Sequence, residues 1–232
     1  MSATRRQLLL DLHRDAPRTL DNFVPGSNLE LIGRIEALAT PSTGDRLYIW
    51  GAAGCGRSHL LEAAEHAAEA VRPVLRLSAA KIDAEIDLRP STLLIVDDVE
   101  RLSEAAQIAL FRRFNDTLAL NLALLLAGSL PPGELVLRED LRTRIGQCLV
   151  YEIKPLSDAE KAAALACFAA GRNMRLDDSV VLYLLRHGRR DLPSLLEAIA
   201  ALDRASLEQK RPATLPLLRE IMQSTIEFHC FP

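Results

Sequence analysis

Residues 51–58, Gly-Ala-Ala-Gly-Cys-Gly-Arg-Ser, have the spacing of a phosphate-binding loop, with arginine where lysine is usual. Glycines at Gly51, Gly54 and Gly56 would let backbone N–H groups turn toward phosphate oxygens. The N-terminus of a following helix adds partial positive charge, and the Ser58 hydroxyl can hold Mg²⁺. The alternative is an ordinary glycine-rich turn between a strand and a helix. The spacing favours the phosphate loop and predicts nucleotide binding.

A pair of carboxylates, Asp97 and Asp98, follows the apolar run at residues 93–96. Parallel sheets bind ligands at the carboxyl ends of their strands, where this pair would lie. Asp97 would orient the shell of the magnesium ion, and Asp98 could polarise an attacking water. An aspartate pair after a strand is by itself more often a helix cap or a turn. Its place downstream of the glycine-rich loop favours the functional interpretation.

Arg57 stands where the phosphate loop usually has lysine. A guanidinium is a planar fork and an ammonium is a compact point charge, so this exchange is not conservative between two phosphates. We therefore expect nucleotide binding to survive and efficient hydrolysis to suffer.

Five apolar runs predict the strands that would position these residues: 47–50, 74–77, 93–96, 122–127 and 149–153. Helical stretches at 58–71 and 103–118 lie between them, and Ser103 is a suitable N-cap for the second. Strands that alternate with helices imply parallel pairing through crossover helices. The expected fold is an α/β sheet covered by helices on both faces.

The alternation ends near Pro155, and only helical patterns follow. Their predicted N-caps are Ser157, Asp177 or Asp178, Asp191 and Thr214. The sequence thus predicts three parts: a flexible arm over residues 1–19, an α/β nucleotide-binding domain over 20–155, and a small all-helical domain over 156–232.

Composition excludes several functional classes. The 232 residues carry a net charge of −3, so no overall positive field attracts nucleic acid or anionic lipid. With 6 Phe, 3 Tyr and 1 Trp, a single-strand binder built on stacked aromatic side chains is not expected. No apolar run is long enough for a membrane span or a secretory signal. The four cysteines are scattered, which is typical of reduced thiols and predicts a cytoplasmic protein.

The order and spacing of five short segments resemble the DnaA-related AAA+ family, and more closely its short Hda branch. The segments are Leu20–Val24, Arg57–Leu61, the Asp97-Asp98 pair, Gly128–Pro132 and Leu202–Ser206. This resemblance covers nearly the whole chain. It implies a P-loop AAA+ domain with a parallel sheet flanked by helices, followed by a small all-helical lid domain.

The resemblance also implies site residues beyond the phosphate loop. Asn22 and Phe23 fall in the segment that lines the adenine pocket, His59 follows the loop serine, and Ser129 lies in the first sensor region. Together with the loop they would bind ADP or ATP with Mg²⁺.

In this family an arginine finger comes from a helix just before the last strand. The matching stretch is residues 140–146, which puts Arg144 in that place, with Arg138 and Arg142 as local competitors. A finger brought from a neighbouring subunit neutralises charge that develops on the γ-phosphate. The second sensor, normally a lid arginine, is Pro193 here. We therefore expect no autonomous turnover.

The N-terminal arm contains Gln7, Leu8, Leu10 and Leu12 in a pattern that resembles the peptide by which bacterial proteins dock on the sliding clamp of DNA polymerase III. The glutamine amide would hydrogen-bond in a clamp groove, and the leucines would fill apolar pockets. The alternative is an N-terminal helix folded on the body.

The stretch between residues 77 and 93 is short for the paired helices with which initiators grip single-stranded DNA, and no helix-turn-helix domain follows the lid. The resemblance then implies a negative regulator of chromosomal replication initiation. Such a protein docks on the DNA-loaded clamp, reaches DNA only through it, and activates hydrolysis of the ATP bound to the initiator DnaA, which leaves the inactive ADP form. Homodimer formation stays open. The alternative is an autonomous AAA+ ATPase, either a helicase loader or a transposition helper.

Overall fold

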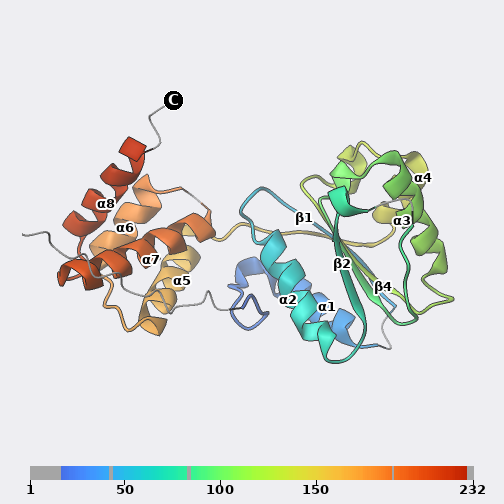
Figure 1. Cartoon of the computed structure of the whole chain (residues 1–232), viewed down its shortest axis with the longest axis horizontal. Coiled ribbons are helices and arrows are strands. Elements are labelled where there is room, and N and C mark those ends of the chain that lie inside the picture. The colour runs from blue at the N-terminus through green and yellow to red at the C-terminus, as the bar shows by residue number, and fades with distance from the viewer. Residues whose placement is uncertain (1–16, 42–43, 83–84, 190, 229–232) are drawn as a thin grey trace, which may run out of the picture. The chain divides into compact units, whose positions relative to one another are not determined.

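The computed structural model describes residues 17–41, 44–82, 85–189 and 191–228, which form two compact units (Figure 1). The first unit, Arg18–Ser157, is an α/β structure, and the second, from Asp158 onward, is helical. Each unit has its own buried apolar core. The predicted α/β core followed by helices is confirmed.

A five-stranded parallel sheet forms the centre of the first unit, in the order β2-β3-β4-β1-β5. Its strands are β1 (Arg46–Trp50), β2 (Val74–Ser78), β3 (Leu93–Asp97), β4 (Ala123–Gly128) and β5 (Leu149–Glu152). Because all strands run in one direction, the loops after β1, β3 and β4 leave the same edge of the sheet. This edge carries the phosphate loop and the acidic pair.

Four helices cover the sheet: α1 (Leu29–Ala39), α2 (Arg57–Glu69), α3 (Glu104–Asp116) and α4 (Glu139–Gly146). Alternate residues of a strand point to opposite faces, so Leu93 and Ile95 of β3 pack in the core that includes α1 and α2. Leu94 and Val96 pack in the other core, with α3 and α4. The buried sheet thus has helices on both faces (Figure 1).

Helix α1 is an element to which the sequence analysis assigned no structure. Its buried residues Leu31, Ile35 and Leu38 recur at helical spacing, which is the signal that identifies it. By contrast, α3 begins as expected, because the Ser103 hydroxyl accepts the N–H of Ala106 at 3.2 Å.

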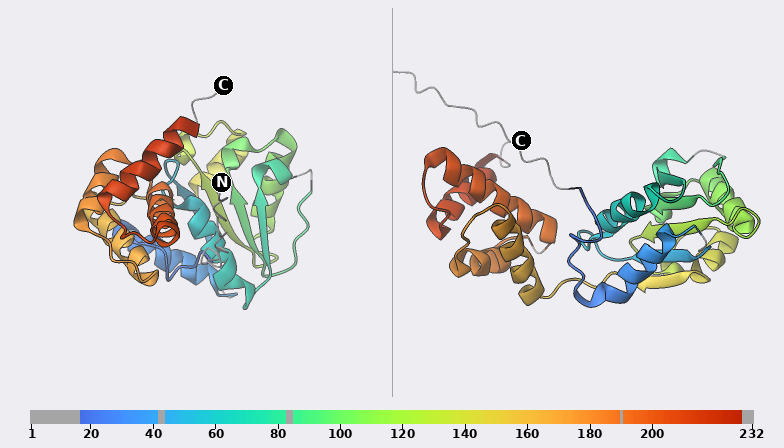
Figure 2. Two further views of the ribbon diagram at one scale, coloured as in Figure 1. Left: turned by 60° about the vertical axis from the view of Figure 1, so that its left-hand side comes forward. Right: turned by 90° about the horizontal axis from the view of Figure 1, so that it is seen from below.

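The second unit contains four described helices, which Figure 2 shows from two further sides: α5 (Asp158–Gly171), α6 (Asp178–His187), α7 (Leu192–Gln209) and α8 (Leu215–Phe228). Asp177 caps α6 by accepting the N–H of Ser179, and Asp191 caps α7 by accepting that of Ser194, each at 2.9 Å. In the part of the chain that the structure describes, no helix is both long and apolar enough to cross a membrane.

Candidate functional site

The glycine-rich loop leaves β1 and enters α2 at Arg57. Gly54 and Gly56 have φ of +77° and +103°, which is the left-handed region that favours glycine. A Cβ on Gly51 would lie 2.9 Å from the Cys55 sulfur. The loop therefore needs glycine at these positions. The N-cap of α2 is Gly56, which makes no side-chain capping bond, so the partial positive charge of the helix N-terminus lies beside the loop.

The side chain of Arg57 is only 17% exposed and points back to the acidic pair. Its Nη2 lies 3.6 Å from Oδ1 of Asp98, and its Nη1 is buried without a hydrogen-bond partner. The loop arginine and the strand β3 carboxylates thus form one charged cluster at the carboxyl edge of the sheet.

Asp97 ends β3, and its Oδ1 accepts the N–H of Asp98 at 2.9 Å. Burial and the neighbouring charge of Asp98 raise the pKa of Asp97. Asp98 has φ of +54°, a conformation that aspartate tolerates better than most residues. Arg101 also pairs with it, with Nη1 3.8 Å from Oδ2. Asp98 therefore lies between two guanidinium groups, a setting unlike that of a free water-activating carboxylate.

Glu100 is a member of this cluster that sequence reasoning missed. Its Oε1 accepts the backbone N–H of Ser129 at 3.0 Å and the Ser129 hydroxyl at 2.5 Å. Its Oε2 is buried without a hydrogen-bond partner. The short turn η3 (Val99–Arg101) carries Glu100 to this place, and an acidic residue three positions after Asp97 is the available signal. Ser129 thus binds a carboxylate of its own chain, and its contact with a nucleotide stays a prediction.

The beginning of the loop that follows β4 is tightly packed around Tyr48. The Tyr48 hydroxyl donates to the carbonyl of Leu130 at 2.5 Å, and a Cβ on Gly128 would lie 2.9 Å from Oε2 of Glu100. Burial and the charge of Glu100 raise the pKa of Tyr48. The tyrosine is therefore a neutral donor that fixes the loop carrying Ser129.

The segment expected to line an adenine pocket packs on the phosphate loop. Asn22 Oδ1 accepts the N–H of Thr19 at 3.0 Å, and His59 Nε2 lies 3.0 Å from the Thr19 carbonyl. The rings of Phe23 and His59 meet edge to face at 5.3 Å between centroids. Burial lowers the pKa of His59. The structure thus brings Phe23 and His59 together, with Phe23 against Gly56, while Asn22 holds the backbone of Thr19 that also contacts His59.

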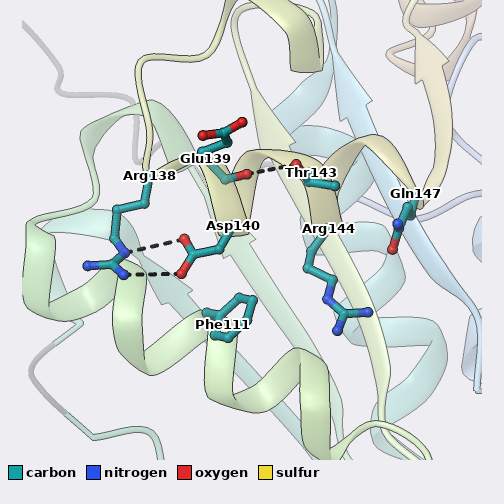
Figure 3. A pocket seen from close by; sticks show the side chains of 7 residues that line it. All are labelled: Phe111, Arg138, Glu139, Asp140, Thr143, Arg144 and Gln147. Carbon is teal, nitrogen blue, oxygen red and sulfur yellow. Dashed lines mark hydrogen bonds and ion pairs between the residues drawn. The ribbon is translucent and has the colours of Figure 1, made fainter.

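A separate recess of about 860 Å³ lies between α3 and α4 (Figure 3). It is lined by Phe111, Arg138, Glu139, Asp140, Thr143, Arg144 and Gln147. Arg138 donates to both carboxylate oxygens of Asp140, at 3.3 and 3.1 Å. Arg144 makes looser contacts, with Nη2 donating to Oδ1 of Asn115 at 3.3 Å and Cζ 5.9 Å from the Phe111 ring centroid. Of these two arginines, Arg144 has the more readily available guanidinium.

In the helical unit, Pro193 occupies the first turn of α7 behind the Asp191 cap. Proline suits this position because the first N–H groups of a helix lack intrahelical partners. Arg189 is 86% exposed and lies 4.0 Å from Asp191. The position expected for a second sensor therefore carries no charge.

Residues 158–222 match the family model described as the lid domain of Hda. The structure resembles domain III of the Thermotoga maritima replication initiation protein DnaA, with a TM-score of 0.75 and 19% identity. The match covers 90% of this chain and 97% of the DnaA domain. The helical unit thus matches the Hda lid domain, and the chain has the fold of DnaA domain III.

Two further solved structures have the same AAA+ fold. Replication initiator DnaA bound to AMPPCP and single-stranded DNA is 23% identical, with a TM-score of 0.71 over 89% of this chain and 68% of that one. A variant of Thermotoga maritima RuvB is 16% identical, with a TM-score of 0.73 over 90% and 72%. The predicted AAA+ core with a helical lid is thereby confirmed.

A magnesium ion requires near-octahedral oxygen ligands at about 2.0–2.1 Å. In this AAA+ core, one oxygen of Asp97 already accepts a backbone N–H, and Asp98 is held by Arg57 and Arg101. Within the described ranges, no three His, Cys, Asp or Glu side chains converge on a common metal position. A magnesium ion at a nucleotide site takes only one or two protein oxygens and completes its shell with phosphates and waters, so the acidic pair alone does not decide whether the site binds the ion. Metal binding by Ser58 and Asp97 stays a prediction from the motif.

The proposed clamp-binding residues Gln7, Leu8, Leu10 and Leu12 lie outside the residues that the structure describes. Their role therefore rests on the sequence pattern alone.

Proposed function

We propose that this AAA+ protein is a negative regulator of replication initiation that supplies Arg144 to ATP bound in the initiator DnaA. The carrying observation is the Arg144 side chain, which lines an open recess. Among the described residues it has one hydrogen bond to Asn115 at 3.3 Å and a ring contact with Phe111, and no ion pair with a carboxylate. A guanidinium released from such contacts can neutralise charge on the γ-phosphate of a partner's ATP. Hydrolysis then leaves DnaA in its ADP form.

The neighbouring arginine is less suited to this role. Arg138 forms a two-point hydrogen bond with Asp140, and this bond holds the pKa of the aspartate below its usual range. Moving Arg138 toward a partner would break both hydrogen bonds and leave the Asp140 carboxylate without its guanidinium partner. Arg138 therefore serves as a matched control for Arg144.

The protein's own nucleotide site supports a role in which hydrolysis occurs elsewhere. Arg57 pairs with Asp98, the residue expected to polarise water, and Pro193 replaces the second sensor. We propose that the site holds ADP or ATP and that the nucleotide organises the domain. The AMPPCP-bound DnaA structure, which shares this fold, supports nucleotide binding.

We further propose that Gln7, Leu8, Leu10 and Leu12 dock this protein on the sliding clamp. Its near-neutral charge suits a protein that reaches DNA through the clamp. The Hda lid match supports DnaA as the partner.

The test loads the clamp on DNA, adds DnaA with labelled ATP, and measures hydrolysis with and without this protein. We expect the full chain to accelerate hydrolysis strongly, Arg144→Ala and Gln7→Ala to lose at least tenfold of the stimulation, and Arg138→Ala to retain most of it. Equal stimulation by Arg144→Ala would exclude the finger assignment. Rapid ATP turnover by this chain alone would instead favour an autonomous ATPase.

A further inference from the structure

Arg57 is held as part of the acidic cluster even though it belongs to the phosphate loop. Its side chain is largely buried, and its Nη2 lies 3.6 Å from Asp98. A lysine ammonium is one compact charge, whereas a guanidinium presents five N–H donors in a plane. Arg57 can therefore keep one edge on Asp98 and offer other donors to a second anion.

Two buried polar atoms of opposite charge lack hydrogen-bond partners in this cluster: Nη1 of Arg57 and Oε2 of Glu100. The charge of Arg57 also acts on Asp97 and Glu100, although burial and Asp98 leave the pKa of Asp97 raised overall. Arg57 thus pairs with Asp98 and lies within electrostatic range of two further carboxyl groups. An unpaired buried N–H carries a desolvation cost. The part of the Arg57 side chain that a phosphate oxygen can reach is its exposed 17%, and a charge-assisted hydrogen bond there would be a strong one.

A P-loop site ordinarily needs Mg²⁺ because the ion neutralises phosphate charge and bridges it to the acidic strand end. Here the guanidinium already connects the loop to Asp98. We propose that Arg57 is the resident counter-ion of the bound nucleotide, so that a nucleoside diphosphate binds this protein without requiring Mg²⁺. This inference rests on the proposed nucleotide site and specifies its chemistry.

The experiment titrates fluorescently labelled ADP into the full chain, once with Mg²⁺ and once with excess EDTA. For the unmodified protein we expect the dissociation constants in the two buffers to agree within about threefold. A loss of tenfold or more in EDTA would overturn the inference while leaving nucleotide binding intact. No binding in either buffer would overturn both the inference and the proposed nucleotide site.

Arg57→Lys is the diagnostic variant because it keeps the charge and removes the fork. We expect its ADP affinity to fall at least tenfold when Mg²⁺ is removed, since a lysine offers one compact charge in place of the planar fork that spans Asp98 and phosphate. Arg211→Lys is the matched control, because Arg211 forms a two-point pair with Glu220 in the helical unit, at 3.0 and 3.2 Å. It should behave as the unmodified protein does. Metal-independent binding by Arg57→Lys would contradict the role assigned to the guanidinium.

The clamp assay separates this inference from the regulatory function. Stimulation of DnaA hydrolysis is read in the partner's site, whereas ADP affinity with and without Mg²⁺ is read in this protein alone. Failure of the Arg144 test therefore leaves the Arg57 result valid, and the reverse also holds.

Discussion

The ring of Phe23 lies directly against the backbone of Gly56, since a Cβ at that glycine would be 2.8 Å from Cε2 of the ring. Gly56 also has φ of +103°, where other residues are strained. One contact thus joins the segment before α1 to the phosphate loop. The shape of the loop depends on a glycine for both its backbone angle and its packing.

Gly56→Ala should lower the free energy of unfolding by roughly 1–3 kcal/mol, because it adds strain and displaces Phe23. It should also weaken ADP binding at least tenfold. Gly33→Ala is the control, since Gly33 lies inside α1 and a Cβ there meets nothing within 4 Å. The Gly33→Ala change should raise the free energy of unfolding by roughly 0.5–1 kcal/mol. Urea denaturation of both variants checks the prediction, which fails if their midpoints move together.

Arg72 joins three backbone segments at the other end of the sheet. It is 4% exposed and donates to the carbonyls of Ser91 at 2.7 Å, Leu38 at 2.8 Å, Thr40 at 3.1 Å and Asn121 at 3.4 Å. Arg72→Lys should lower the free energy of unfolding by roughly 1.5–3 kcal/mol, because an ammonium cannot span these acceptors. Denaturant unfolding measures the change.

Arg18→Lys controls for the loss of a guanidinium as such. Arg18 is 52% exposed and pairs with Glu62 at 3.3 Å, an exposed pair of little energetic weight. Its unfolding midpoint should match that of the unmodified chain. A stable Arg72→Lys would show that the buried carbonyls find other partners.

The sheet was predictable because its strands are short apolar runs separated by helical patterns, and buried parallel strands are near-continuously apolar. Leu93–Asp97 is such a strand. Helix α1 was harder, because its N-cap residue Asn28 makes no side-chain capping bond and so gives no start signal. The buried residues Leu31, Ile35 and Leu38 are its main mark, and they stand among other apolar residues that blur the helical spacing.

The phosphate loop and the acidic pair were predictable from spacing, whereas their interaction was not. Nothing in the sequence order states that Arg57 turns toward Asp98 or that Glu100 binds Ser129. These pairings depend on side-chain rotamers and on the turn after β3, which brings residues 29 positions apart into contact. The sequence shows which residues are present and how they are spaced, whereas side-chain packing determines which of them come into contact.

The Glu100–Ser129 contact predicts a pH-dependent contribution to stability. Burial raises the pKa of Glu100, but the hydrogen bonds from Ser129 outweigh it and lower the pKa below the ordinary value of 4.5. Because the pKa of Glu100 is lower in the folded state, its ionised carboxylate stabilises the folded protein at pH values above 4.5. This contribution is lost as the pH falls through the lowered pKa.

Ser129→Ala should therefore lower the free energy of unfolding at pH 7 by about 1 kcal/mol, the worth of one hydrogen bond. The difference from the unmodified chain should shrink below pH 4.5 as Glu100 becomes protonated. Urea unfolding at pH 7 and pH 4 measures both values. A difference that stays constant across this range would show that the serine acts through packing alone.

The three described cysteines should differ in their reaction with N-ethylmaleimide at pH 8. Burial raises the pKa of Cys148 to about 12, so its reactive thiolate fraction is roughly one part in ten thousand. Cys167 is exposed and should react first. Cys55 is partly exposed within the phosphate loop, and burial raises its pKa, so its rate should be intermediate. Mass spectrometry of digested protein gives the three rates.

Bound ADP should change only one of these rates. Because Cys55 lies between Gly54 and Gly56, a nucleotide in the loop would cover its thiol and slow its modification several-fold. Cys167 belongs to α5 of the other unit and serves as the internal control, so its rate should stay constant. Equal slowing of both thiols would indicate a general effect of the nucleotide on the protein, whereas selective protection of Cys55 would locate ADP at the phosphate loop.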